Sequence, residues 1–323
     1  MRAPTIKEVA AKSGVGIGTV SRVLNNSPQI SEETRKKVMD AIKELNYVPN
    51  VAGKRLSQSR SNVIAVVVPV IYHPFFSKLI QELELAADKR GYSLLVASSQ
   101  HRIEKEQEIL NRLAQRQADG AIFVTHYEHK ESDFDNLAIV TIDRNLGKNI
   151  PIVTSDNYEA TKKGVEHLVE KGCKKIAFLG TRATQTSEVT LREKAYRDVI
   201  ESHHLESIVI NKDVGHGEEG ILIDELLAHK DIDGVFVSGC ILAYTLQDRL
   251  ELLGIKVPEQ IQIVSYDGDF SLIRRSNITT LEQQIKPMAE RCVELLIQIL
   301  NKEENIEKMN KFECSFKKGK TTK

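Results

Sequence analysis

The chain has 323 residues, of which 41% are hydrophobic and 28% charged, an ordinary composition for a globular protein of two or three domains. Its 45 Lys and Arg residues balance its 45 Asp and Glu residues. No apolar run approaches the roughly 20 residues that span a bilayer, and no apolar signal segment opens the chain. We therefore expect no membrane partner and a cytoplasmic location.

The balanced charge hides a basic N-terminal segment and an acidic remainder. Residues 1–60 contain 11 Lys and Arg residues but only 5 Asp and Glu residues. The rest of the chain is acidic by the same margin. A basic segment attached to an acidic body indicates that the segment binds a polyanion.

Three short helices are expected in this basic segment. Thr5 and Glu8 have the spacing of a capping box, which begins the first helix. Gly14 and Gly16 interrupt the pattern, a second helix resumes near Gly16, and Ser31 caps a third. The apolar residues expected on the buried faces are Ile6, Val9, Ala10, Val20, Val23, Leu24, Val38, Ile42 and Leu45.

Pro49 ends the third helix, so we expect a helical headpiece over 1–49 and a polar, basic linker over 50–61. From 62 to 323, apolar runs alternate with helical stretches, which predicts an α/β body of two doubly wound subdomains. The expected strands lie near 63–70, 93–98, 120–124, 138–142, 175–179, 207–210, 233–237 and 261–265. A further strand, "KFECSF", is expected near the end of the chain.

The glycines in "SGVGIGTVSRVLNN" allow two interpretations. A dinucleotide-binding loop needs a preceding strand and G-x-G-x-x-G spacing, whereas here a helix precedes the spacing G-x-G-x-G. The alternative is a helix-turn-helix, in which the start of the second helix faces base edges in the major groove of DNA. Ile17, Gly18 and Arg22 would share that face, and Arg22 could donate two hydrogen bonds to guanine. Short donors suited to phosphates follow at Thr19, Ser21 and Asn25.

The segments "TIKEVAAKSGV", "TVSRVLNN" and "SEETRKKVMDAIKELNYVPNVAGKRL" resemble the headpiece of the LacI/GalR family of bacterial transcriptional regulators. The likeness is dense over 4–60 and looser up to about 318. It implies a homodimer on palindromic operator DNA, with a hinge helix over 50–58 that orders on DNA and inserts Leu56 into the minor groove. Leu56 could equally be an exposed leucine of a linker. The residues assigned to DNA contact are Thr5, Gly16, Ile17, Gly18, Thr19, Ser21, Arg22, Asn25, Ser31, Thr34 and Leu56.

The body also resembles family bodies of the periplasmic-binding-protein type, which bind small-molecule effectors. "HPFFSKL" resembles an N-P-F-F segment whose two aromatic rings stack on a sugar, although His73 replaces the usual asparagine. Phe75 and Phe76 could equally belong to the core. Asp143 and Arg144 follow a strand, and a carboxylate beside a guanidinium suits a polyol. The residues assigned to the effector are His73, Phe75, Phe76, Asp143, Arg144, Arg192, Asp267 and Gln283. A structural ion-pair network is the alternative for the charged ones.

One segment departs from the family pattern. Gly239 and Cys240 stand where an Asn-Asp pair is usual, so the effector could be larger than a monosaccharide, be held by fewer hydrogen bonds, or not be a free sugar. "IPIVTSDNYEA" resembles sucrose-operon repressors and hints at a disaccharide or a phosphorylated sugar. Arg144 and Arg192 could both serve a phosphate.

The helices after the first strand of each half of the body, including the one within "FFSKLIQELELAADKRG", are expected to supply the dimer face. No catalytic or cofactor-binding motif is present, so neither an enzyme nor a cofactor is expected. The four cysteines lack C-x-x-C spacing and are expected to be buried thiols. "HYEH" (126–129) is interpreted as a solvent-exposed histidine pair, with a metal site as the minor alternative.

The sequence thus predicts a repressor of a carbohydrate operon that a sugar or sugar-phosphate effector releases from DNA. The alternatives are a co-repressed regulator or an activator with a non-sugar effector, and a sugar-binding sensor without operator specificity.

Overall fold

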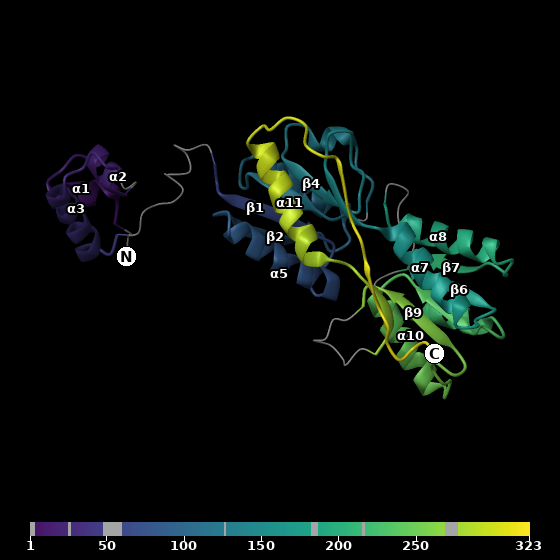
Figure 1. Cartoon of the computed structure of the whole chain (residues 1–323). Helices are drawn as coiled ribbons and strands as arrows, with labels where there is room; N and C mark the ends of the chain where they lie inside the picture. The colour runs from purple at the N-terminus through teal and green to yellow at the C-terminus, as the bar shows by residue number, and fades with distance from the viewer. Residues whose placement is uncertain are drawn as a thin grey trace. The chain divides into compact units, whose positions relative to one another are not determined.

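The computed structural model describes residues 4–24, 27–47, 60–125, 127–181, 187–214, 217–268 and 277–323. Its internal contacts divide the chain into two units, Met1–Ser61 and Asn62–Lys323 (Figure 1). Within the described ranges, no helix has both the length and the apolar character needed to cross a membrane.

The first unit contains three helices, α1 (Ile6–Ser13), α2 (Ile17–Leu24) and α3 (Glu32–Glu44). The predicted capping box at the start of α1 is confirmed: the Thr5 hydroxyl accepts from the Glu8 N–H, and the Glu8 carboxylate accepts from the Thr5 N–H. Ser31 caps α3, as predicted: its hydroxyl accepts from the Thr34 N–H.

The buried residues of this unit form one small core, which consists of Val9, Ala10, Val20, Val23, Val38, Ala41 and Tyr47. Five of these seven were predicted. Ile42 and Leu45 are only partly buried at its edge, because Ala41 and Tyr47 take the central positions instead.

The second unit contains two six-stranded sheets, each covered by helices on both faces. The first sheet has the order β11-β5-β4-β3-β1-β2, and all of its strands are parallel. Its strands are β1 (Val63–Val68), β2 (Ser93–Ser98), β3 (Gly120–Phe123), β4 (Ile139–Ile142), β5 (Ile152–Ser155) and β11 (Met309–Phe312). Its helices are α5 (Pro74–Asp88), α6 (Ile103–Ala114), α11 (Ile285–Leu300) and the short 3-10 helix η1 (Glu131–Phe134).

The second sheet has the order β12-β10-β9-β8-β6-β7 and is parallel except for β12, which runs antiparallel to β10. Its strands are β6 (Ile176–Thr181), β7 (Ile208–Lys212), β8 (Gly234–Val237), β9 (Gln262–Tyr266), β10 (Thr279–Glu282) and β12 (Ser315–Lys317). Helices α9 (Gly220–Ala228) and α10 (Cys240–Leu252) cover one face, and α7 (Asn157–Glu170) and α8 (Thr190–Ser202) cover the other.

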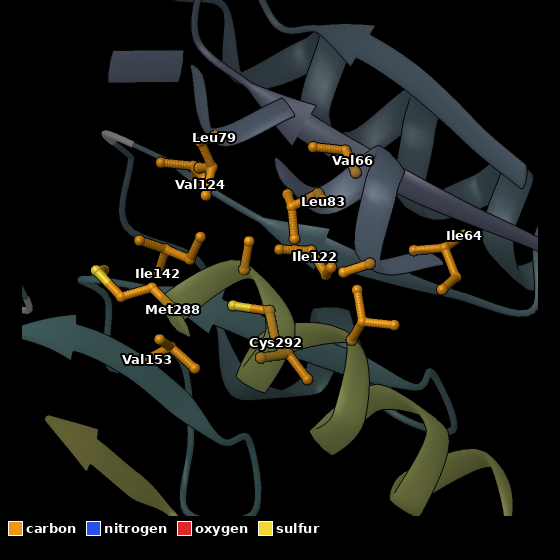
Figure 2. Packing of buried hydrophobic residues seen from close by; sticks show 14 of the residues in the cluster. Ile64, Val66, Leu79, Leu83, Ile122, Val124, Ile142, Val153, Met288 and Cys292 are labelled. Atoms are coloured by element: carbon orange, nitrogen blue, oxygen red, sulfur yellow. The ribbon is translucent and has the colours of Figure 1, made fainter. Parts of the chain in front are cut away.

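The core of the first sheet shows why its central strand is a continuous apolar run. Ile64, Val66 and Val68 of β1 face α5 and α11 (Figure 2), whereas Ala65 and Val67 face α6. Successive strand residues point to opposite faces, so a strand covered on both sides must be apolar throughout.

The chain crosses between the two sheets three times, at residues 156, 283–284 and 313–314; we call these the crossing segments. Hydrogen bonds tie them together. The Asp156 N–H donates to the Phe312 carbonyl at 2.8 Å, and the Gln284 side chain donates to the Glu313 carbonyl at 3.0 Å.

All eight predicted strands of the body are present, but β5 and β10 were not foreseen. Each strand has only four residues and contains polar residues at an end, so neither forms an apolar run that the sequence would reveal. The prediction of one strand over "KFECSF" was wrong: Glu313 and Cys314 separate β11 in the first sheet from β12 in the second. The alternating apolar and polar residues of this segment do not reveal that the chain leaves one sheet and enters the other.

Candidate functional site

The start of α2 presents an exposed surface that carries few side chains. Gly14 adopts the left-handed conformation (φ 70°) that ends α1 and turns the chain, as predicted. Beyond it, Gly16, Ile17, Gly18 and Arg22 are all exposed, and Ile17 keeps 46% of its surface in solvent. An exposed isoleucine contributes little to the small core. Its apolar side chain suits contact with a thymine methyl group.

Several of the other residues assigned to DNA contact lie at helix starts. The Thr5 and Ser31 hydroxyls are N-caps, and the Ser31 hydroxyl donates to Thr34 Oγ1 at 2.9 Å. Helix N-termini present free N–H groups and a partial positive charge, both of which suit phosphates.

Thr19 and Ser21 are half-buried on α2, next to the exposed residues of that helix. Asn25 and Leu56 lie outside the described residues, as does most of the predicted linker.

Arg35 is a supporting residue that the sequence interpretation missed. Its guanidinium donates to the Val23 carbonyl at 3.4 Å and to the Ser27 carbonyl at 3.0 Å. These bonds hold the end of α2 to α3 and satisfy carbonyls that the helix end leaves free. The helical period of the sequence predicts that Arg35 is half-buried on α3. It does not predict the carbonyl groups that Arg35 binds.

A second candidate site lies where several strands of the body end. Asp143 directly follows β4, Asp267 follows β9 and Gln283 follows β10, while Arg192 belongs to the first turn of α8. We call these four residues the polar cluster. Ligands of parallel α/β sheets bind at the carboxyl ends of the strands. Both aspartates have left-handed backbones, with φ of 59° and 61°.

Arg192 is buried and held on three sides. Its Nε donates to Asn157 Oδ1 at 2.7 Å, and its Nη1 donates to the Ser238 carbonyl at 2.9 Å. Its guanidinium stacks on the Tyr266 ring, 3.5 Å from the centroid. A cation on an aromatic face with two fixed hydrogen bonds has one orientation.

Hydrogen bonds connect the polar cluster to a crossing segment. Gln283 Nε2 donates to Asp267 Oδ1 at 2.6 Å, and the Ser155 hydroxyl donates to Gln283 Oε1. On the first sheet, the Thr154 hydroxyl donates to Asp143 Oδ1 at 2.5 Å. The cluster thus reaches both sheets through residues at their strand ends.

Burial raises the pKa of both aspartates of the cluster. For Asp143 desolvation is the main cause, and the Thr154 hydrogen bond and the Arg192 charge oppose it. For Asp267 desolvation is again first, opposed by Arg192 and Gln283. The Arg192 guanidinium therefore acts on both buried carboxyl groups, and Arg144 adds a weaker effect on Asp143.

His73, Phe75 and Phe76 lie apart from these contacts. Both phenylalanines are buried in the core of the first sheet, with their ring centroids 5.4 Å apart in edge contact. The core interpretation therefore describes their packing here. His73 caps α5, since its Nδ1 accepts from the Phe75 N–H at 3.2 Å.

Replacing His73 by asparagine is expected to reduce the loss of stability in acid. Burial lowers the pKa of His73 to about 4. Between pH 6.5 and 4 the unfolded chain then binds a proton that the folded chain does not, so stability falls as the pH falls, by roughly 3 kcal/mol in all. Asparagine keeps the cap and does not titrate. Urea unfolding at pH 7 and pH 4.5 measures the loss of stability in acid for each protein. As a control, replacing the exposed His229 by asparagine should leave that loss the same as in the unmodified protein. An equal loss in His73→Asn would contradict this explanation.

The Arg144 guanidinium interacts with the Asp143 charge, and its hydrogen bond to Thr125 lies outside the polar cluster. Its Nε donates to the Thr125 carbonyl, and the side chain is buried near Glu106 and Glu128. The assignment of Arg144 to the effector contacts remains a prediction.

The interpretation of "HYEH" as a solvent-exposed pair was wrong for His129. Its side chain is buried, and its Nε2 lies 2.6 Å from Glu106 Oε2. The Thr125 hydroxyl also donates to that oxygen at 2.6 Å. His126 lies outside the described residues. In the part of the chain that the structure describes, no group of three His, Cys, Asp or Glu side chains is placed to hold a metal ion.

Gly239 and Cys240 begin α10 beside the cluster. No heavy atom of the described residues lies within 4 Å of the point where a Cβ of Gly239 would be. Cys240 is buried, as are Cys173 and Cys292, whereas Cys314 is only half-buried beside the Tyr266 hydroxyl, 3.1 Å away. Room is therefore present at Gly239, where a polar side chain is missing.

Three family models match the chain. "Bacterial regulatory proteins, lacI family" matches residues 5–50, "Periplasmic binding proteins and sugar binding domain of LacI family" matches 61–230, and "Periplasmic binding protein-like domain" matches 165–322. The second of these covers more than half of the chain.

The chain belongs to the LacI family. The ribose operon repressor of Halalkalibacterium halodurans is 33% identical over 92% of this chain and 91% of its own length. The sucrose operon repressor of Streptococcus mutans is 32% identical over 91% of this chain and 92% of its own length. A LacI-type regulator from Alkaliphilus metalliredigens, solved with D-xylulofuranose, is 28% identical, with a TM-score of 0.73 over 81% of this chain and 99% of its own.

The LacI-family resemblance pointed to Arg192, Asp267 and Gln283, and the position after a strand pointed to Asp143, but neither revealed what orients these side chains. Asn157 and Tyr266, which fix the Arg192 guanidinium, were missed. Both lie at strand ends, Asn157 just after β5 and Tyr266 at the end of β9. That position is the signal that could have found them.

Proposed function

We propose that this LacI-family regulator is a homodimeric repressor of a carbohydrate-utilisation operon. Its headpiece binds palindromic operator DNA, and a small sugar effector at the polar cluster weakens that binding. The protein works where the DNA is, in the cytoplasm. The observation that carries the proposal is the exposed, nearly bare start of α2 within a basic segment.

In this proposal Ile17 and Arg22 read bases, and Gly18 leaves room between them. The half-buried hydroxyls of Thr19 and Ser21 and the caps at Thr5 and Ser31 position the headpiece on phosphates. Residues 50–61 link headpiece to body, and Leu56 inserts between the central base pairs.

The effector enters at the polar cluster and shifts the protein between two arrangements of the sheets. The contacts of Ser155, Gln283 and Asp267 support this role, because they join a ligand-facing carboxyl to a crossing segment. A ligand shifts such an equilibrium only by its difference in affinity for the two arrangements. A sugar is supported by the ribose and sucrose repressors among the relatives and by the bound D-xylulofuranose of the similar structure.

A dimer is supported by exposed apolar side chains on β2, on α5 and in the segment between β1 and α5. Tyr72, Leu85 and Leu95 are 63%, 46% and 42% exposed, and Leu95 lies on β2, an edge strand. Large exposed apolar residues, and exposed edge strands in particular, favour an interaction surface.

Selection of operator sequences from random DNA, followed by anisotropy titrations at two salt concentrations, tests the proposal. We expect palindromic sites that bind at least 1,000-fold tighter than random DNA, in line with specific regulators at about 10³ or more. Adding the sugar found by a thermal-shift screen should weaken operator binding. A sugar that tightens it would instead establish a co-repressed regulator, and binding without sequence preference would establish a sensor without operator specificity.

Gly18→Ala is expected to stabilise α2 and change the selected operator. Alanine is better than glycine in a helix by about 1 kcal/mol, and no heavy atom of the described residues lies within 4 Å of the new Cβ. Amide hydrogen exchange of α2 should slow by about fivefold. Gly14→Ala is the matched control and should destabilise the headpiece instead, because the backbone at Gly14 (φ 70°) disfavours a side chain. An unchanged operator preference in Gly18→Ala would contradict its place on the reading face.

A further inference from the structure

Two segments of the acidic body are strongly basic. Residues 157–175 comprise α7 and the turn that follows it, and residues 315–323 comprise β12 and the tail that follows it. Together they contain nine lysines and only three glutamates, whereas residues 61–323 as a whole contain six more acidic than basic side chains. The two segments are far apart in the sequence, so only the fold can combine their charge.

The fold brings the two segments together. The Phe316 ring of β12 packs on the His167 ring of α7, with 4.8 Å between the ring centroids. Gln262 of β9 joins the other ends of the segments. Its side-chain amide donates to the Lys171 carbonyl at 3.1 Å, and its Oε1 accepts from the Lys323 N–H at 2.9 Å. The lysines of both segments therefore belong to one surface.

The tail that carries part of this surface is anchored to the second sheet. Thr321 and Thr322 are buried. The Thr321 hydroxyl accepts from the Thr279 N–H at 2.9 Å, and the Thr322 hydroxyl lies 2.9 Å from Thr279 Oγ1. Lys320 and Lys323, on either side of the two threonines, are exposed. The backbone of these lysines thus has a fixed position at the surface.

Most of the lysines in the two segments have no carboxylate partner. Lys175 pairs with Glu206 at 3.7 Å, and Lys317 pairs with Glu282 at 3.3 Å. The other seven form no ion pair with any residue that the structure describes, and all of them except the half-buried Lys171 are exposed. We call these seven the lysine face: Lys162, Lys163, Lys171, Lys174, Lys318, Lys320 and Lys323.

The carboxylates beside the lysine face are engaged elsewhere. Glu166 of α7 lies 2.8 Å from His203 Nε2, and Asp198 pairs with Lys194 at 2.7 Å. Asp233 accepts from two backbone N–H groups just before β6, each at 2.8 Å. Two of the three glutamates of the segments therefore remain against seven lysines.

Local stability accounts for only some of these lysines. The C-terminal end of a helix favours a cation, which explains Lys171 directly after α7. A lysine at an edge strand prevents pairing with another strand, which explains Lys318 directly after β12. Lys162 and Lys163 lie in the middle of α7, where neither effect operates. The charges also repel one another, since Lys171 and Lys318 add to the burial that lowers the pKa of His167. A surface that keeps repelling cations together favours an anionic partner.

The composition of the lysine face favours a nucleic acid over a protein partner. Protein interfaces are depleted of lysine and depend on large aromatic or apolar anchors. Residues 157–175 and 315–323, all of which the structure describes, contribute no large exposed apolar side chain. A lysine ammonium is a point charge that suits a phosphate, and contacts to phosphates do not depend on base sequence.

We infer that the lysine face is a second DNA-binding surface, which contacts the phosphates of a duplex without reading its sequence. The surface belongs to the body and shares no residue with the headpiece. A regulator whose headpieces occupy an operator can then hold a second segment of DNA through its body. This contact goes beyond the proposed function, which places DNA on the headpiece and the linker alone.

A second duplex offered to the operator-bound protein tests the inference. The full-length protein is saturated with one equivalent of unlabelled operator duplex per dimer. A fluorescent duplex of random sequence is then titrated, with anisotropy as the readout, at about 50 mM and about 200 mM salt. We expect the second duplex to bind, and to bind at least 10-fold more weakly at the higher salt concentration. Absence of binding at both concentrations would overturn the inference and leave operator recognition intact.

Two charge-matched variants show where the second duplex binds. The first variant replaces four exposed lysines of the face by glutamine: Lys162, Lys174, Lys318 and Lys320. The control replaces four exposed lysines that belong to the helices and loops of the first sheet: Lys148, Lys286, Lys302 and Lys308.

We expect the first variant to bind the second duplex at least 10-fold more weakly than the unmodified protein, with unchanged operator affinity and unfolding midpoint. Its plot of log affinity against log salt should become shallower by about 0.9 for each lysine that meets a phosphate. The control should bind the second duplex as the unmodified protein does. Equal losses in the two variants would attribute the binding to net charge and overturn the inference.

An acidic polypeptide separates the two classes of polyanion. Poly-L-glutamate with the same total charge as the random duplex is added as a competitor. We expect it to displace the second duplex only at concentrations at least 10-fold higher than those of unlabelled random duplex. Displacement at equal or lower concentrations would assign the lysine face to an acidic protein and overturn the inference.

Discussion

Arg192→Ala is expected to lower the free energy of unfolding by about 3–5 kcal/mol at pH 7 and to abolish effector binding. The side chain is 4% exposed and is the charge that Asp143 and Asp267 share. Its removal leaves the buried Asp267 carboxyl group without a cation and leaves Asp143 with the Arg144 charge alone. The pKa of each should then rise further above its already raised value.

The pH dependence distinguishes this cause from a simple loss of packing. Carboxyl groups with a raised folded-state pKa bind more protons in the folded than in the unfolded chain, so the stability of Arg192→Ala should fall as the pH rises from 5 to 8. Urea unfolding across this range measures it. Arg192→Ala combined with Asp267→Asn should recover part of the loss. A loss that is constant with pH would rule out the electrostatic explanation.

Arg22→Ala is expected to weaken operator binding by about 10- to 100-fold, equivalent to about 1–3 kcal/mol, while binding to random DNA changes little. Arg22 is exposed on α2, so the fold should be unaffected. Anisotropy titrations with the selected operator and with random DNA at the same salt concentration give the two affinities.

The control for Arg22→Ala is another exposed basic residue of the same unit. Lys12 forms an ion pair with Glu44 at 2.8 Å and lies on α1. Lys12→Ala removes the same charge and should reduce both affinities equally, if at all. An equal loss on operator and random DNA in Arg22→Ala would place this residue on the phosphate backbone.

The features that local sequence determines were predicted well. The capping box of Thr5 and Glu8 and the left-handed turn at Gly14 depend on neighbours within a few residues. The same holds for the buried strands, whose apolar runs are continuous. Gly239 illustrates the limit: the sequence shows the missing side chain, and only the structure shows the space that it leaves.

Contacts across many residues were not predicted. Glu106 and His129 are 23 residues apart and belong to different elements, so no spacing rule pairs them. Asp143 and Arg144 are adjacent, yet they form hydrogen bonds with different partners, Asp143 with Thr154 and Arg144 with the Thr125 carbonyl. The passage of the chain from β11 to β12 at Cys314 likewise depends on how the three crossing segments join the sheets. The neighbouring residues in the sequence do not reveal it.

The return of α11 to the first sheet has a consequence for the order in which the protein forms during synthesis. The strands β1 to β5 are complete by Ser155, but Met288, Cys292 and Leu296 of α11 cover the face formed by Val66, Ile122 and Val140. Figure 1 shows this helix, near the yellow end of the chain, beside α5 and β1. In a growing chain, the part of this apolar face that α11 covers therefore stays exposed while β6 to β10 of the second sheet are made. Transiently exposed apolar surface of this kind is prone to aggregation, so we expect the first sheet to be most vulnerable during that interval.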